Sequence, residues 1–191
     1  MSGKLRLSGS TSGYIELQPE AAANSSTLTI PNEGFGRILQ IVQHYRTDVW
    51  SEDVAAGTKS GAGMTKTITT TANDRKVLVS FDVCVSAAGP ANRIGVTIKR
   101  GGTEIALSDD TSDNKLRDTV GVKQGDVNAM YICSFQYLDT PGNAADYTYT
   151  LHFNTGSSST REVFLNRAST ESNHNYRFRA TSHLTLAEVV G

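Results

Sequence analysis

Residues 77–85 read Val-Leu-Val-Ser-Phe-Asp-Val-Cys-Val, and this stretch decides the fold. An apolar side chain stands at every second position, which is the period of a β-strand with one face against a core. The same alternation places Ile94, Val96 and Ile98 on one face of a second stretch. We therefore expect both stretches to be half-buried strands of one β-sandwich.

Further strands follow along the chain, separated by turn residues. The pair Gly101-Gly102 predicts a hairpin into a strand over 103–107. Residues 130–138 and 147–153 also alternate, on either side of a turn at 139–143. Shorter strands are expected over 37–43, 65–71, 161–166 and 184–190.

About eight strands after residue 35, with no long helical pattern, predict an all-β sandwich of the jelly-roll type. The Thr-rich stretch 65–71 suits the half-exposed edge of a sheet. The last strand, 184–190, is expected inside its sheet, so that its loss would unfold the domain. Binding is expected in the loops, which are predicted over 55–63, 108–124 and 168–175.

The first 35 residues are too few to form a core of their own. Two short alternating runs, 14–18 and 27–30, flank a loop of small residues. We expect residues 1–35 to be an attachment arm and residues 36–191 to be the jelly-roll domain.

Composition excludes several classes of function. The chain has 191 residues, 18 basic and 19 acidic side chains, and no basic stripe, so no nucleic-acid partner is expected. No apolar run approaches the roughly 20 residues that span a bilayer, so membrane insertion is not expected. The N-terminus also shows no signal-peptide pattern.

No catalytic, cofactor or metal motif is found, and we expect no enzyme activity and no cofactor. The four histidines have no metal-ligand spacing. Cys84 and Cys133 lie in predicted strands and are interpreted as two buried thiols, although sequence cannot exclude a disulfide. The acidic stretch 109–114 does not fit a calcium loop of the EF-hand type and is interpreted as a solvated loop.

Trp50 lies in a polar stretch and has two interpretations. The ring either packs against the end of the sandwich or a neighbouring subunit, which we favour, or stacks on a sugar. On the second interpretation a receptor-contact loop would contain Trp50, Asp109, Asp110 and Asp113.

Five short segments together carry a resemblance to a known family. They are 36–43, 73–79, 96–105, 137–141 and 184–189, in this order. The chain from Tyr14 onward resembles the C-terminal domain of fibre-type virion proteins of tailed marine phages, which is similar to the C1q/TNF-like jelly roll. The resemblance implies a homotrimer and a location on the virion, after assembly in the host cytoplasm.

A tail fibre needs a shaft and an attachment domain, and about 35 residues are short for both. The resemblance therefore implies a trimeric capsid decoration protein on the outer capsid surface, with the major capsid protein as partner. The residues expected to contact the capsid are Leu5, Leu7, Tyr14, Ile15, Leu17, Leu28 and Ile30. The alternative is a short tail fibre or receptor-binding tip that recognises a host surface glycan.

Overall fold

The computed structural model describes residues 5–8, 14–17, 37–89, 93–109, 116–173 and 178–190. The chain divides into two units, Met1–Asn32 and Glu33–Gly191. In the first unit, β1 (Leu5–Ser8) pairs antiparallel with β2 (Tyr14–Leu17). No helix in the described part of the chain is long and apolar enough to cross a membrane.

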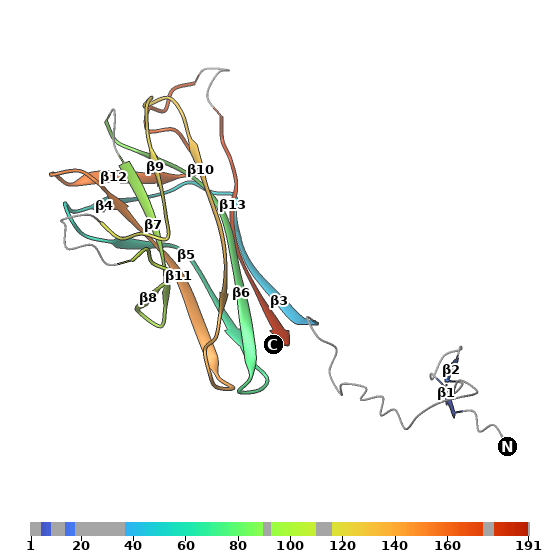
Figure 1. Ribbon diagram of the computed structural model, residues 1–191. Helices are drawn as coiled ribbons and strands as arrows, with labels where there is room; N and C mark the ends of the chain where they lie inside the picture. Colours follow the sequence, from blue (N-terminus) through green and yellow to red (C-terminus); the bar gives the residue numbers. More distant parts are fainter. Residues whose placement is uncertain are drawn as a thin grey trace. The chain divides into compact units, whose positions relative to one another are not determined.

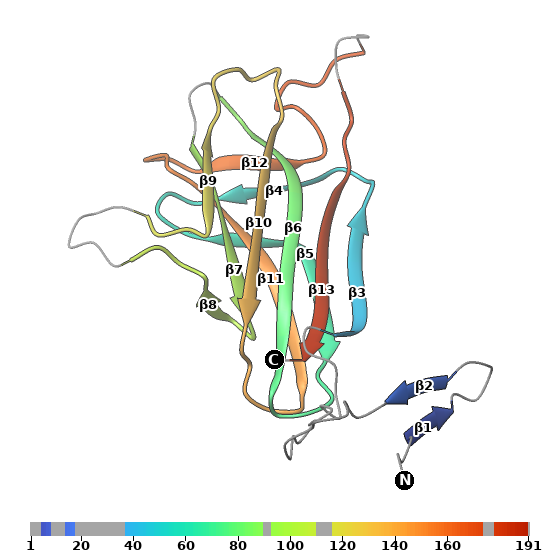
Figure 2. The ribbon, with the colours of Figure 1, turned by 45° about the vertical axis from the view of Figure 1, so that its right-hand side comes forward.

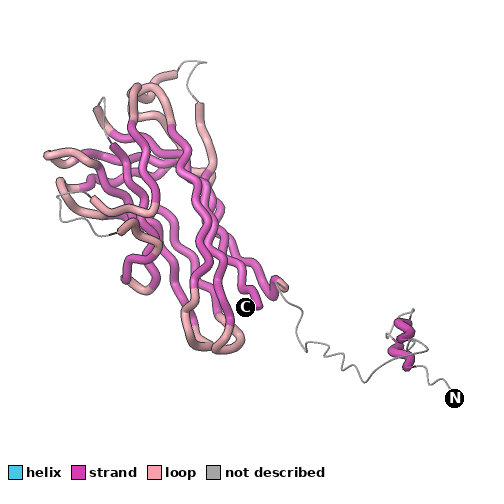
Figure 3. The backbone as a smooth tube through the Cα atoms, viewed as in Figure 1, coloured by secondary structure: helices cyan, strands magenta, loops and turns pink. Residues whose placement is uncertain are grey.

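The second unit is built from strands and the loops between them (Figures 1 and 3). Within the described residues it contains eleven strands, β3 to β13. They are β3 (Ile38–Arg46), β4 (Trp50–Val54), β5 (Ser60–Thr69), β6 (Arg75–Ala87), β7 (Arg93–Arg100), β8 (Thr103–Ile105), β9 (Val120–Lys123), β10 (Tyr131–Asp139), β11 (Asp146–Thr155), β12 (Arg161–Leu165) and β13 (Ser182–Val190).

Eight of these strands form two antiparallel sheets of four. The first sheet has the order β3-β13-β6-β10, seen side by side in Figure 2, and is extended by β12 and β4. The second sheet has the order β5-β11-β7-β9, with β8 also on β7. Counted along the chain, these orders are 1-8-3-6 and 2-7-4-5, which is jelly-roll connectivity. The predicted fold class is therefore confirmed.

The core lies between the two sheets and is made by the alternation seen in the sequence. In β6 every second residue is buried, and β10 presents Tyr131, Cys133, Phe135 and Tyr137 to the same side. The second sheet contributes Ile94, Val96 and Ile98. The core residues of β6 that the sequence predicted are Val77, Val79, Phe81, Val83 and Val85, all at most 1% exposed.

Two positional predictions are also confirmed. β5, which contains most of the Thr-rich stretch, is at the edge of the second sheet, and β13 lies between β3 and β6.

Two strands were missed. β4 begins at Trp50 in a stretch taken as polar, and β9 lies within the predicted loop 108–124.

An ion-paired cluster joins the two sheets near one end. Asp139 of β10 is buried and accepts hydrogen bonds from Tyr149 Oη and Arg100 Nη1, both at 2.6 Å. Arg100 and Tyr149 belong to the second sheet. Burial, followed by the Asp139 carboxylate, raises the pKa of Tyr149, so the phenol stays protonated and donates.

Both cysteines are free thiols, but only one is fully buried. Cys133 faces the core, opposite Val83, and burial raises its pKa to about 12. Cys84 is opposite Ile132 and points to the other side of the sheet, where it is half-buried. The prediction of two buried thiols is therefore wrong for Cys84, because adjacent positions of a strand alternate between faces.

Candidate functional site

The side of the first sheet that faces away from the core carries an ordered pattern of side chains. We call it the outer face. Strand pairing places Val189 and Lys76 opposite each other at the edge of this face where β6 begins, and the remaining residues in four rows. The rows are Ile41–Ala187–Leu78–Leu138, then Gln43–Thr185–Ser80–Gln136, then Tyr45–His183–Asp82–Ser134, and Cys84–Ile132.

Large apolar side chains are exposed in this pattern. Ile41 is 60% exposed, Leu138 48% and Ile132 65%, although all three lie on regular strands. In the apolar row that crosses all four strands, the exposed side chains are those at its two ends, Ile41 and Leu138, because Ala187 is only 5% exposed. Exposed apolar side chains on a regular sheet are typical of an interaction surface.

The outer face carries few charges, which are Lys76 at its edge and the Asp82–His183 pair. Asp82 is 3.2 Å from His183 Nε2 and accepts a short hydrogen bond from Ser134. In the row below, Gln43 donates to Thr185 at 2.8 Å. Such a face, apolar and depleted in charge, has the composition of the buried centre of a protein–protein interface.

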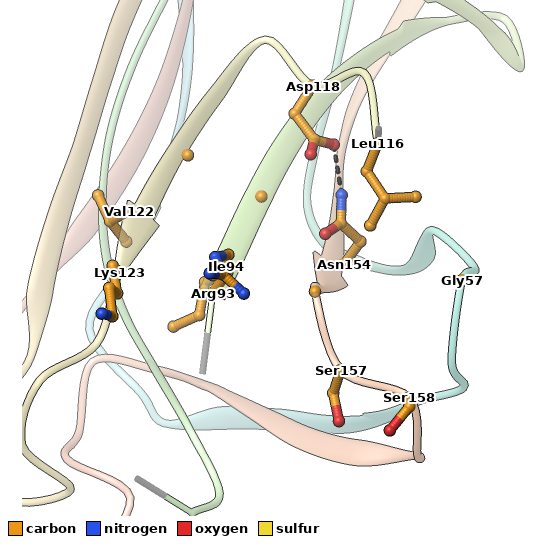
Figure 4. Close-up of a pocket in the computed structure, with 13 residues that line it drawn as sticks. Gly57, Arg93, Ile94, Leu116, Asp118, Val122, Lys123, Asn154, Ser157 and Ser158 are labelled. Atoms are coloured by element: carbon orange, nitrogen blue, oxygen red, sulfur yellow. Dashed lines mark hydrogen bonds between the residues drawn. The ribbon is translucent and has the colours of Figure 1, made fainter. Parts of the chain in front are cut away.

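A pocket of about 710 Å³ lies on the opposite side of the sandwich, over the second sheet (Figure 4). Its floor is a row of three paired residues, Asn154 of β11, Gly95 of β7 and Gly121 of β9. The two glycines have no side chain, so the floor is low there. Leu116 and Asp118 cover one side of the floor, and Ser157 and Ser158 lie at another. We call it the glycine-floored pocket, and its volume is in the range of small-molecule sites.

Asp118 is held in place by three neighbours. Its Oδ1 accepts a hydrogen bond from Thr97 at 2.8 Å and a short one from Asn154 Nδ2, and Lys59 Nζ is 3.8 Å away. The Asp118 side chain is only 14% exposed. It is therefore a fixed carboxylate and not a solvated loop residue.

Two cations lie across the pocket from Asp118. Arg93 and Lys123 are opposite each other in the β7–β9 pairing, and both are exposed. Neither makes an ion pair with any residue in the described ranges. Figure 4 shows them apart from the Asp118–Asn154 pair.

His152 occupies the next row of the second sheet, opposite Thr97. Burial, followed by the Lys99 cation, lowers the pKa of His152, so the ring is neutral at pH 7. The ammonium group of Lys59, which is 3.8 Å from Asp118, also donates a hydrogen bond to Glu104 at 2.8 Å. The positive charge of Lys59 is therefore shared between Glu104 and Asp118.

The residues predicted for the arm lie only partly in the described residues. Leu5 and Leu7 are in β1 and pair with Leu17 and Ile15 of β2, whereas Tyr14 is opposite Ser8. Leu28 and Ile30 lie outside the described residues.

The residues predicted for a receptor loop are not brought together in the described structure. Trp50 is half-buried, and its ring packs against Phe153 with centroids 5.6 Å apart. This position agrees with the packing interpretation. Asp109 is exposed, and Asp110 and Asp113 lie outside the described residues.

Sequence reasoning missed the pocket because its residues come from four separate segments. Only one signal was available: an isolated glycine inside a strand, such as Gly95, indicates a close approach of other atoms. Among the described residues no group of three His, Cys, Asp or Glu side chains could hold a metal ion.

Comparison with known proteins gives structural matches only. No family model and no curated protein matches the chain. A chain from the structure of infectious bursal disease virus, Gx strain, matches with a TM-score of 0.41 and 14% identity over 97% of this chain. A chain from the infectious bursal disease virus VP2 subviral particle matches with a TM-score of 0.39 and 11% identity over 95%. This chain spans about half of each, 48% and 46% respectively, and similarity at this level does not establish a common function.

Proposed function

We propose that the chain is a structural protein of a virion, that it assembles as a homotrimer through the outer face, and that it has no enzyme activity. The N-terminal unit attaches it to the capsid, and the jelly roll is displayed on the outer capsid surface. The single observation that carries the proposal is the apolar row Ile41–Ala187–Leu78–Leu138 on the outer face.

The occupant of this face is a second copy of the chain. The outer face has one acid, Asp82, already partnered by His183 and Ser134 of the same sheet. A neighbouring subunit can therefore pack on this face without meeting an unpaired carboxylate there. A stable assembly needs roughly 1,200–2,000 Å² of buried surface, and a four-stranded face is large enough to contribute to it.

The attachment to a virion rests on the sequence resemblance and on the separate N-terminal unit. β1 and β2 form a two-stranded hairpin, and isolated hairpins of this size are marginal in water. Pairing with another protein stabilises such a hairpin, and strand addition is one way to achieve it.

The trimer is tested by measuring the mass of the protein in solution by light scattering. The wild type is expected at three times the 20.5 kDa chain mass, and Ile41→Asp and Leu138→Asp are expected to be monomers. The matched control is Phe178→Asp, because Phe178 is 71% exposed but lies outside the outer face. A monomeric wild type, or a trimer that survives both substitutions, would refute this assembly.

The attachment is tested with phage capsids stripped of their minor proteins. The full chain is expected to bind in multiples of three per shell, and a variant without residues 1–32 is expected to remain a folded trimer but not to bind. Binding that does not depend on residues 1–32 would contradict the attachment role.

A second function is supported by the glycine-floored pocket. A receptor-binding tip needs a concave site for a host glycan, and this pocket is a concave site of suitable size. Adsorption of the purified protein to host cells, without binding to capsids, would favour the tip over the decoration protein.

A further inference from the structure

The floor of the glycine-floored pocket depends on the absence of a side chain at position 95. A Cβ at Gly95 would lie 2.2 Å from Asp118 Oδ2 and 2.5 Å from Asn154 Nδ2. Glycine therefore allows the carboxylate and the amide to lie directly on the sheet. At Gly121 a Cβ would meet only Ile94 O, at 3.6 Å, so this part of the floor is open.

Two polar atoms in the pocket have no partner among the described residues. Asp118 uses Oδ1 for Thr97, Asn154 and Lys59, and its Oδ2 accepts no hydrogen bond from them. Asn154 is 2% exposed and donates through Nδ2, which leaves its Oδ1 as a free acceptor. Neither atom is among the buried side-chain atoms without a partner, so both are open to solvent and can accept from a ligand that brings hydroxyl groups.

The other side of the pocket is suited to an anion. Arg93 and Lys123 have no acidic partner in the described structure, and both line the pocket. Arg93 packs its stem against Gly156, whose Cβ would lie 3.1 Å from Arg93 Cβ. Leu116 adds an apolar surface at the rim, where the C–H face of a sugar ring can lie.

We propose that the glycine-floored pocket binds a saccharide that carries a carboxylate. Hydroxyl groups of the sugar donate to Asp118 Oδ2 and Asn154 Oδ1, and its carboxylate pairs with Arg93 and Lys123. Neither half of the site is sufficient: a plain anion leaves the two acceptors unpaired, and a neutral sugar leaves the two cations unpaired.

This site deepens the second function, recognition of a surface glycan, and is independent of the trimer and of capsid attachment. Its test uses purified full-length protein and soluble probes. Failure of sugar binding therefore leaves the mass measurement and the capsid assay unaffected.

The experiment compares three probes by ligand-observed NMR. D-Glucuronate carries both chemical features, D-glucose has the hydroxyl groups without the carboxylate, and inorganic sulfate is an anion without sugar hydroxyls. Glucuronate is expected to bind with millimolar affinity, and glucose and sulfate at least about tenfold more weakly. Equal binding of sulfate and glucuronate would overturn the proposal, and so would the absence of glucuronate binding.

Substitutions locate the binding. Gly121→Leu fills the open part of the floor and is expected to abolish glucuronate binding, and Asp118→Asn is expected to weaken it about tenfold with an unchanged fold. The double variant Arg93→Gln/Lys123→Gln is expected to lower glucuronate binding to that of glucose. The matched control, Arg37→Gln/Lys76→Gln, removes two cations outside the pocket and is expected to bind normally. Binding that survives Gly121→Leu would overturn the assignment.

Discussion

Trp50 has room against Phe153 because two glycines face it from β5. A Cβ at Gly61 would lie 2.7 Å from the Trp50 ring, and Gly61 also has a φ of +90°, which favours glycine. A Cβ at Gly63 would lie 3.1 Å from the same ring and 2.9 Å from Leu165 Cδ1. The ring of the single tryptophan therefore packs over two positions of β5 that have no side chain.

We predict that Gly63→Ala destabilises the protein by about 1–3 kcal/mol, the usual cost of overpacking a core. The physical reason is the close contact with Leu165 and Trp50, which cannot both move away. Urea unfolding measures the effect. Gly121→Ala is the control and is expected to change stability by less than about 0.5 kcal/mol, because its Cβ has space. Equal stabilities of the two variants would contradict this account.

Glu188 is a fully buried acid and gives stability a dependence on pH. Burial alone would raise its pKa, but hydrogen bonds from Thr71 and Gln40 and the charge of Arg75 lower it below the ordinary value. Thr71 donates twice, at 2.6 and 2.7 Å, and Gln40 once at 2.7 Å. The folded state therefore holds the carboxylate in its charged form.

The sign of the pH dependence follows from this lowered pKa. The contribution is complete above the unfolded-state value of about 4.3 and is lost as the pH falls through the folded-state pKa. Glu188→Gln should be less stable at neutral pH, and its difference from wild type should narrow below about pH 4.3. Urea unfolding at several pH values checks this, and a difference that stays constant down to acid pH would contradict it.

At the scale of strands, the sequence predicted the elements whose alternation is strong. The core-facing residues of β6, β7, β10 and β11 could be predicted because one face of each strand meets the core. β9 could not, because Val-Gly-Val-Lys is short and its strand character comes from pairing with β7. The glycine-floored pocket could not be predicted either, since Asp118, Asn154 and Arg93 become neighbours only through strand order.

We predict that removal of residues 182–190 abolishes cooperative unfolding. β13 lies between β3 and β6 and pairs with both along its length, so its loss leaves two unpaired edges and removes the core side chains of Leu184 and Leu186. Circular dichroism and thermal melting measure the outcome. The control is the variant without residues 1–32, which should melt as the wild type does. A cooperative transition in the truncated protein would show that the first sheet does not need β13.

At the scale of the whole molecule, the reactivity of Cys84 reports on assembly. Its half-buried thiol lies on the outer face beside Ile132, whereas Cys133 is inside the core. In the proposed trimer a neighbouring subunit covers Cys84. The two thiols therefore distinguish three states of the protein: assembled, dissociated and unfolded.

We predict that a thiol reagent labels Cys84 at least about tenfold more slowly in the wild type than in monomeric Ile41→Asp. Neither form should label Cys133 until urea is added, because burial raises its pKa and blocks access. Mass spectrometry of the labelled protein counts the modified thiols. Equal rates for wild type and Ile41→Asp would mean that no subunit covers the outer face.

The pairing of β3, β13 and β6 places the C-terminal strand end beside the start of the domain, at one end of the jelly roll. Ile38 at the start of β3 is opposite Val189 at the end of β13, and Val190 is opposite Arg75 at the start of β6. β6 then runs for 13 residues, roughly 40 Å, to the end where β7 begins with Arg93 and the glycine-floored pocket. A peptide fused after Val190 would therefore lie at the end of the domain where β3 and β6 begin. An insertion at Ser157–Ser158 would lie at the opposite end of the domain, next to the glycine-floored pocket.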